Sequence, residues 1–500
     1  CHFACQLQYW RLYLLSLVLG IEGCFQYGIQ LSLVASPEVH IQSFVNYTWM
    51  VRYKTPIDKS TNQLIWSFFV AVLSVGCWAG AVHSGSLPVT YGRLNPRLFF
   101  ELSGTSQLMV FSRTAKSFEM ILLGRFLYGY NNGLGLCVHL MYLCESSPQK
   151  LRGFLTLTSS IFIGLGKVVG QIIGINETLC QLNLSKDLFI GRLMEQTLDV
   201  ILVVFLCPTA LQWLWQEDNL KMELDDMQLE RERSQGEKAK TVKDLLTSRC
   251  VRWQLLTLAI PCARLQFCGI NALCFYAFDI FRESGVPEDK MHYLAIDIGA
   301  TELIAITLCS FLIDRAGRKK LMGYGYLLMG ITMCVLTVML SIKVNTFSTF
   351  PLLLLYVRGF IPSIQLLQDL NSWIPYVNIT LIFCVICIYG LGPSGVSMVL
   401  LADLFLQVWR PSAYVVCGTI NWLCMFVIGL LFGYIVDGLG QFCFLFLMAY
   451  SLGSGAFIIY FVPETKGKTM VEIMEDFNKL NYKNRTGDIE NTDVGLETKF

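Results

Sequence analysis

The sequence predicts an all-α membrane protein with twelve transmembrane helices arranged as two six-helix halves. Hydrophobic residues make up 54% of the 500 residues and charged residues only 15%, whereas a soluble domain has roughly 25% charged residues. Twelve apolar runs approach the length of about 20 residues that a helix needs to cross a bilayer. The same pattern of charges also occurs twice along the chain. Together these observations exclude a soluble globular protein.

Each apolar run is expected to be one helix, because every backbone polar group in a span must be hydrogen-bonded within that span. The third and sixth runs give the weakest signal. The expected transmembrane helices lie at residues 11 to 35, 64 to 87, 98 to 112, 118 to 143, 154 to 174, 197 to 215, 253 to 281, 293 to 313, 321 to 342, 379 to 403, 413 to 436 and 441 to 462.

A long polar stretch separates the sixth run from the seventh. It contains MELDDMQLERERSQGEKAK, whose interspersed charges indicate a soluble helical linker. The second half carries a surplus at 345–369, which we expect to be an insertion. The predicted units are an N-terminal half at 1–215, a cytoplasmic linker at 216–252, a C-terminal half at 253–463 and a cytoplasmic tail at 464–500.

Basic residues in the short links predict the orientation in the membrane. Most of them follow even-numbered runs, which places those links and both termini in the cytoplasm. Several basic residues on the other side weaken the rule. The N-Y-T acceptor at Asn46 lies in the first outer link, where glycosylation is expected. The first run is expected to be retained, since no signal-peptide pattern surrounds it.

The repeated charges predict a cytoplasmic gate. Glu145 and Arg152 follow the fourth run seven residues apart, and Asp403 and Arg410 follow the tenth run with the same spacing. Carboxylates and guanidinium groups can pair there and must separate when the inner mouth opens. Duplicated halves with a binding site between them are typical of secondary transporters. The gating candidates are Arg93, Glu145, Arg152, Arg318, Asp403 and Arg410.

Charge and cysteine usage exclude several other classes. The 38 basic and 37 acidic residues leave a formal charge of +1, which provides no field for binding nucleic acid. Many of the 19 cysteines lie inside apolar runs, including the close pair Cys384 and Cys387, which argues against a disulfide framework or a zinc site. Five scattered histidines and no nucleophile constellation argue against an enzyme, a metal or a cofactor. The expected partners are the bilayer and a small molecule.

Several short motifs are spread over most of the chain. They are FQYG at 25–28, GRF at 124–126, MYLCESSP at 141–148, GQIIG at 170–174, CGINA at 268–272, DRAGRKKL at 314–321, NWL at 421–423 and PETKGKT at 463–469. With these motifs the chain resembles the facilitative sugar transporters of the major facilitator superfamily. This resemblance implies the major facilitator fold, a plasma membrane location and hexose uniport by alternating access. QFC before Gly269, together with Glu302, is similar to the subclass that carries fructose and urate.

The resemblance also implies a sugar site. Hexose hydroxyls donate and accept hydrogen bonds at once, so they suit neutral amides, and the apolar face of the ring suits an aromatic wall. An amide in a span can equally form a hydrogen bond between helices, worth about 0.6 kcal/mol on average. The implied substrate-binding residues are Gln171, Gln266, Asn271, Glu302, Asn421 and Trp422.

Departures from the family pattern leave other functions open. The family's PESPR signature is absent after the sixth run, where WLWQEDNL stands, and the tenth run reads GPSGVS in place of a proline-rich element. A non-transporting sensor or a degraded paralogue is therefore one alternative. A proton-coupled symporter is another: Gln30 replaces the aspartate of proton-coupled relatives, but Glu22 shares its helix face. A carrier of urate or another organic anion is the third.

The charged residues within apolar runs include Glu22, Lys167, Arg264 and Glu302. A lone charge in a span costs about 2.5 to 3.5 kcal/mol, so these side chains should face the cavity or one another. We expect Glu22 to neutralise Lys167 and Glu302 to neutralise Arg264, which would leave a neutral cavity suited to a sugar. Unpaired cations would instead attract an anion such as urate.

Overall fold

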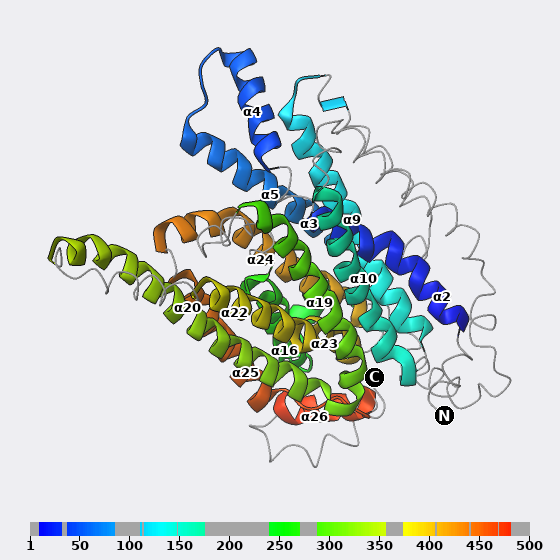
Figure 1. Ribbon diagram of the computed structural model, residues 1–500. Coiled ribbons are helices and arrows are strands. Elements are labelled where there is room, and N and C mark those ends of the chain that lie inside the picture. Colours follow the sequence, from blue (N-terminus) through cyan, green and yellow to red (C-terminus); the bar gives the residue numbers. More distant parts are fainter. Residues whose placement is uncertain are drawn as a thin grey trace.

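The computed structural model describes residues 10–32, 38–85, 111–112, 115–147, 149–175, 240–270, 288–356, 374–405, 408–439, 442–468 and 470–481. Within these ranges the regular secondary structure is entirely helical. The helices that precede the linker lie on one side of the molecule and those that follow it lie on the other, as the blue-to-cyan and green-to-red ribbons show (Figure 1). We call these two sets the N-terminal and the C-terminal helix groups.

The N-terminal helix group contains one span interrupted by a π-helical turn. Residues 10–32 run without a break from an α-helix through this turn into a second α-helix. Asp58 caps the following long helix, because its carboxylate accepts a hydrogen bond from the Ser60 amide at 3.2 Å. The elements are α2 (Trp10–Leu19), η1 (Gly20–Phe25), α3 (Gln26–Ser32), α4 (Glu38–Tyr53), α5 (Lys59–His83), α9 (Phe118–Ser146) and α10 (Gln149–Ile175).

The C-terminal helix group contains a second π-helical turn, η2 (Gly390–Ser394), which holds Pro393. This turn lies where the sequence departs from the family's proline-rich element. The tail returns to the group through α26 (Met470–Asn481). The other elements are α16 (Arg252–Phe267), α19 (Glu288–Ala316), α20 (Arg318–Tyr356), α22 (Ile374–Tyr389), α23 (Gly395–Asp403), α24 (Arg410–Leu439) and α25 (Cys443–Phe461). The short helix α15 (Val242–Thr247) lies within the predicted linker and packs against α24 of this group.

Ten of the twelve expected spans overlap with described helices, although residues 271–281 of the seventh lie outside the described residues. The expected span at 98–112 lies almost entirely outside the described residues, and the one at 197–215 lies wholly outside them. Eight of the described helical stretches are long and apolar enough to cross a membrane. The helix α20 continues to Tyr356, so the first part of the expected insertion at 345–369 extends the ninth span. The outer helix α4 was not expected from the sequence.

Glycines bring neighbouring helices of the N-terminal group into backbone contact. A Cβ atom on Gly76 of α5 would lie 2.0 Å from the Phe126 carbonyl oxygen of α9. One on Gly166 of α10 would lie 2.1 Å from the Phe25 carbonyl oxygen at the end of η1. These spacings leave no room for a side chain. Small residues therefore let these helices pack closely.

The helix groups meet mainly along two helix pairs, and α10 also touches α23 while α9 touches α24. In one pair α5 lies against α24, and in the other α10 lies against α19. A Cβ atom on Gly418 of α24 would lie 2.8 Å from the Ala81 Cβ of α5, and one on Gly164 of α10 would lie 3.5 Å from the Leu303 Cα of α19. We call the surface between the groups the dividing surface. Any side chain that these four helices direct toward it can contact both groups.

One disulfide was not expected from the cysteine pattern. Cys262 of α16 is bonded to Cys417 of α24, with their Cα atoms 6.1 Å apart. The two residues are 155 positions apart in the sequence, so no local spacing could reveal their proximity. Both partners belong to the C-terminal group, and the bond therefore does not cross the dividing surface.

The helix α26 is fastened to the start of α16. The Asn481 side chain donates to the Cys250 carbonyl at 2.6 Å and accepts from the Trp253 amide at 3.2 Å. Lys468 donates to Asp476 at 2.6 Å, and this hydrogen bond lowers the pKa of the Asp476 carboxyl. The first part of the tail is therefore folded against the C-terminal group.

Candidate functional site

Three of the expected sugar ligands lie together where the two groups meet. The Gln266 amide of α16 donates to the Asn421 side-chain oxygen of α24 at 2.8 Å. Trp422 follows on α24 and is 1% exposed. Its ring meets the Tyr27 ring of α3 edge-on, with the centroids 5.3 Å apart, and the Tyr27 hydroxyl donates to the Met425 sulfur at 3.7 Å. An aromatic wall and two amides therefore stand at the dividing surface.

Gln171 reaches the same surface from the N-terminal group. Its side-chain oxygen is buried and accepts no hydrogen bond within the described residues. It points at Gly299 of α19, where a Cβ atom would lie 2.2 Å from that oxygen. The bare backbone of Gly299 therefore leaves room for the amide, a role that the sequence did not reveal. Asn271, the other expected amide ligand, lies outside the described residues.

Lys167 and Glu302 form an ion pair across the dividing surface. The Lys167 ammonium of α10 lies 2.8 and 2.9 Å from the two carboxylate oxygens of Glu302 on α19. The two side chains are 4% and 3% exposed. The predicted pairing of Glu302 with Arg264 is therefore wrong. The predicted pairing of Lys167 with Glu22 stays a prediction, because the Glu22 backbone lies in η1 but its side chain is outside the described set.

Arg264 makes its contacts within the C-terminal group instead, although its Nε and Nη1 atoms have no hydrogen-bond partner among the described residues. Its guanidinium donates to the Ser451 hydroxyl of α25. It also lies 5.0 Å from the ring centre of Tyr326 on α20 and 5.8 Å from that of Tyr450 on α25. No carboxylate among the described residues pairs with it. The hydroxyl and the two ring faces therefore solvate a charge that we expected to face the cavity.

The expected role of Glu302 as a direct sugar ligand stays a prediction. In this arrangement both of its carboxylate oxygens contact the Lys167 ammonium, and the side chain is buried. Lys167 lies one helical turn before Gln171 on α10, on the same helix face. The ion pair and the amide are therefore neighbours along this helix.

Two of the expected gating residues have described side chains. Arg410 at the start of α24 is 3% exposed. The Arg318 guanidinium lies beside Gly153 of α10, where a Cβ atom would be 3.1 Å away, and the Arg318 amide donates to the Glu464 carboxylate at 3.0 Å. Arg93 lies outside the described residues. Glu145, Arg152 and Asp403 lie in the helices α9, α10 and α23, but their side chains are not described.

Glu464 belongs to the PETKGKT motif, whose structural role the sequence alone does not reveal. Its carboxylate accepts hydrogen bonds from the first amides of α20, at 3.0 Å from Arg318 and 3.4 Å from Lys319. A carboxylate at a helix N-terminus is favourable because it satisfies unpaired amides and opposes the helix dipole. The motif therefore fastens the start of α20, which carries Arg318, to the tail.

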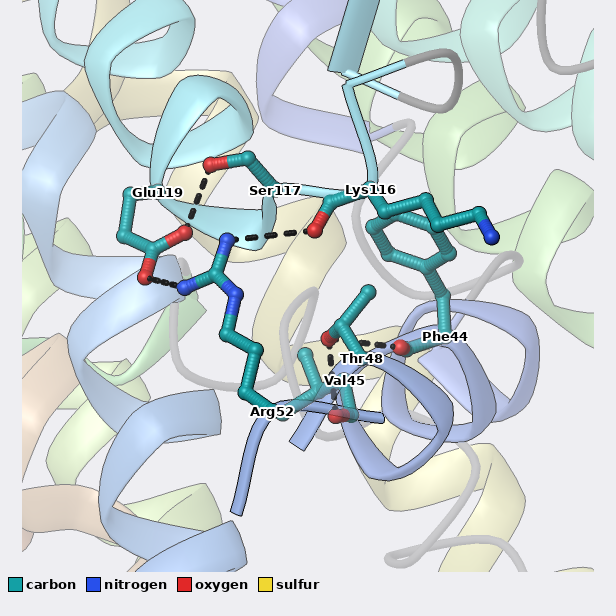
Figure 2. A network of polar contacts seen from close by, with 7 residues as sticks. All are labelled: Phe44, Val45, Thr48, Arg52, Lys116, Ser117 and Glu119. Carbon is teal, nitrogen blue, oxygen red and sulfur yellow. Dashed lines mark hydrogen bonds and ion pairs between the residues drawn. The ribbon is translucent and has the colours of Figure 1, made fainter. Parts of the chain in front are cut away.

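The outer helix α4 is tied to α9 by a polar network (Figure 2). Arg52 forms an ion pair with Glu119 and donates to the Lys116 carbonyl at 3.1 Å. The Ser117 hydroxyl donates to Glu119 at 2.6 Å. The expected glycosylation residue Asn46 is exposed on α4. This network lies in the N-terminal group alone.

Comparisons with known proteins match nearly the whole chain. A family model described as "Sugar (and other) transporter" matches residues 15–477. The chain is 34% identical to human solute carrier family 2, facilitated glucose transporter member 11, over 93% of this chain and 92% of that protein. It is 32% identical to human member 9 of the same family, over 93% and 85%.

A solved structure has the same fold. The proton:xylose symporter XylE of Escherichia coli, bound to 6-bromo-6-deoxy-D-glucose, superimposes with a TM-score of 0.71 at 19% identity. The match covers 93% of this chain and 98% of that one. The predicted major facilitator fold is therefore confirmed.

Proposed function

The chain belongs to the sugar (and other) transporter family, and from this premise we propose that it is a facilitative hexose carrier that works by alternating access. Family membership makes it a multi-pass membrane transporter rather than an enzyme. The relatives that match over more than nine tenths of this chain are named as facilitated glucose transporters. Their shared length supports the transfer of that function to this chain.

The buried oxygen of Gln171 is the observation that carries the proposal. An unsatisfied buried acceptor costs about 1 to 3 kcal/mol, and this one points across the dividing surface. A hexose hydroxyl donating to it would remove that cost. The same sugar would compete for the hydrogen bond between Gln266 and Asn421 and would lay its apolar face on Trp422. We include Asn271 in this site from the family resemblance.

Transport then requires the two halves, 1–215 and 253–463, to tilt about a substrate bound between them. The paired charges at the cytoplasmic ends of the helices serve as the inner gate in this scheme. Arg318 supports it, because its guanidinium faces the start of α10 in the other helix group. We place the carrier in the plasma membrane, with both termini in the cytoplasm and the Asn46 glycan outside.

An organic anion such as urate is the second candidate substrate. Two buried cations favour it, namely Lys167 and Arg264. The carboxylate of Glu302 neutralises the first, and the second lies among Tyr326, Tyr450 and Ser451 inside one group. The charge that could attract an anion at the dividing surface is therefore already balanced, which favours a neutral hexose.

Uptake into proteoliposomes tests the proposal. The purified full-length chain is reconstituted and offered labelled glucose, fructose and urate, with protein-free liposomes as the control. We expect saturable uptake of a hexose that stops at equilibrium with the outside concentration. An imposed proton gradient should not drive accumulation, which separates a uniporter from a proton symporter. The absence of hexose uptake by folded protein would contradict the proposal and favour a non-transporting sensor.

A further inference from the structure

We propose that Lys167 and Glu302 form a charge pair that opens with the transport path and selects a neutral polyol over an anion. This inference rests on the proposed function and specifies how its site distinguishes substrates. It concerns a contact between the helix groups rather than a ligand within one of them. Its basis is the position of the pair, the elements that hold it and the chemistry of a hydroxyl group.

The pair lies near the middle of the membrane. Glu302 is close to the centre of the candidate span Tyr293–Ile313, and Lys167 lies in the outer half of the span Gly153–Ile173. A lysine side chain in a helix leans toward the helix N-terminus, which here brings the ammonium back toward the centre. Charges at this depth are costly unless paired, and they mark substrate paths by default. The bidentate contact at 2.8 and 2.9 Å provides that pairing.

Each partner is packed against a span that contains a π-helical turn. A Cβ atom on Gly28, which follows η1, would lie 2.9 Å from the Lys167 amide nitrogen. One on Gly390, the first residue of η2, would lie 3.1 Å from the Glu302 carbonyl oxygen. π-helical turns interrupt the regular hydrogen bonding of a helix and are frequent at functional sites. The backbones that support both charges therefore adjoin segments that can bend.

The two groups cannot part at this level while the ion pair stays closed. A lysine and a glutamate left apart in an apolar span would each lose the partner that offsets their desolvation. A hydroxyl group can bridge them, because it accepts a hydrogen bond from an ammonium and donates one to a carboxylate at the same time. A hexose offers several hydroxyls, and Gln171 supplies a further acceptor one turn away. The hydroxyl groups of a polyol can therefore replace the ion pair between Lys167 and Glu302 when it opens.

An anion at the same place would be attracted by one member of the pair and repelled by the other. It would gain the Lys167 ammonium but would have to lie beside the Glu302 carboxylate, and like charges at close range repel strongly in a poorly solvated site. The pair therefore admits neutral hydroxylated molecules and disfavours organic acids. Removing the carboxylate charge should reverse this preference, while removing both charges should restore a neutral site.

Four variants of the full-length chain in proteoliposomes test the inference. They are Lys167→Gln, Glu302→Gln, the double variant with both changes, and the swap of Lys167→Glu with Glu302→Lys. Lys479→Gln is the matched control, because it removes a lysine charge from a side chain that is 77% exposed. Uptake of glucose, fructose and urate is measured for each. Hydrogen exchange of the peptides that contain residues 167 and 302 is followed with and without hexose.

We expect each single variant to lose at least about tenfold in hexose uptake, since one buried charge is left without its partner. The double variant and the swap should recover to within about threefold of the parent chain. Glu302→Gln should gain saturable urate uptake that the double variant lacks. Exchange at both peptides should rise in the single variants, and in the parent chain it should rise when hexose is added.

Two outcomes would overturn the inference. One is equal hexose uptake and equal exchange in all four variants and the control. The other is a double variant and a swap that remain as impaired as the single variants. If the parent chain carries no hexose, the proposed function fails separately. The role of the ion pair is then tested by the hydrogen exchange of the two peptides and by urate uptake in Glu302→Gln.

Discussion

Lys167 and Arg264 are two buried cations that the same apolar environment has solvated in different ways. Lys167 contacts a carboxylate on a helix of the other group. Arg264 contacts a hydroxyl and two tyrosine rings, all within its own group. The environment of Lys167 therefore depends on how the groups sit relative to each other, whereas that of Arg264 does not. A charge across the dividing surface is thus coupled to transport, and a charge within one group is coupled to folding.

The two side chains suit these roles chemically. An ammonium is a compact, strongly hydrated charge, so in an apolar site it needs a carboxylate. A guanidinium is planar and weakly hydrated, and it gains energy over aromatic faces. A lysine in place of Arg264 would therefore lack the carboxylate that its ammonium needs.

The largest effect is expected from Lys167→Met. This change leaves the Glu302 carboxylate buried without a counter-charge, which costs about 3 to 5 kcal/mol. Hexose uptake should fall to near background, and the temperature of thermal unfolding in detergent should drop. Lys167→Met combined with Glu302→Met tests the cause, because it removes both charges. If the double variant unfolds at as low a temperature as the single variant, the cost does not come from the lost pairing.

Gly299→Ala should have the next largest effect on uptake. The added methyl group would lie 2.2 Å from the Gln171 side-chain oxygen, so the amide must move away from the dividing surface. Because a hydrogen bond to the substrate is then lost, we expect the KM for hexose to rise roughly threefold to tenfold with little loss of folded protein. Gly453→Ala is the matched control, since no atom lies within 4 Å of a Cβ atom placed there. An unchanged KM in Gly299→Ala would remove Gln171 from the proposed site.

Arg264→Met should affect stability more than transport. It leaves the Ser451 hydroxyl without its partner and removes the contact with two rings, a loss of about 1 to 3 kcal/mol. No buried carboxylate in the described part of the chain is stranded by it. The unfolding temperature should therefore fall while the KM for hexose stays close to that of the parent chain. A loss of uptake with unchanged stability would show that Arg264 belongs to the substrate path.

Breaking the disulfide between Cys262 and Cys417 should change uptake least. The bond joins α16 to α24 one helical turn before Gln266 and Asn421, inside one group. If that group tilts as a unit, Cys262→Ser should leave the hexose transport rate within about twofold of the parent chain, although a lost disulfide can cost about 2 to 4 kcal/mol of stability. Uptake with and without a thiol reductant is the measurement. A strong dependence on the reductant would show that α16 and α24 move against each other.

The sequence predicted the helices and many of the side chains at the dividing surface, but not the residues that these side chains contact. Apolar runs locate spans because the bilayer fixes their length. The pairing of Glu302 with Arg264 assumed that charges pair within their own half. The partner of Glu302 in the structure is Lys167, 135 residues away, and only the packing of α10 on α19 brings the two close.

Two further contacts could not be predicted from the sequence for the same reason. Gly299 carries no side chain that could mark it as part of a site, so its contact with Gln171 appears only when α10 and α19 are placed together. The aromatic surroundings of Arg264 come from α20 and α25, and hydrophobic patterns do not distinguish a tyrosine that solvates a cation from one that packs in a core. The side-chain chemistry of Gln171 and Arg264 could therefore mark them as candidates, but it could not identify the residues that they contact.

The measurement that tests the account most directly is an experimental structure of the full-length chain with hexose bound. We expect the sugar to lie between the two helix groups, with a hydroxyl in the space between the Lys167 ammonium and the Glu302 carboxylate. The Gln171 side-chain oxygen should then accept a hydrogen bond from the sugar. A structure in which hexose binds elsewhere while the contact between Lys167 and Glu302 keeps its length of 2.8 Å would contradict it.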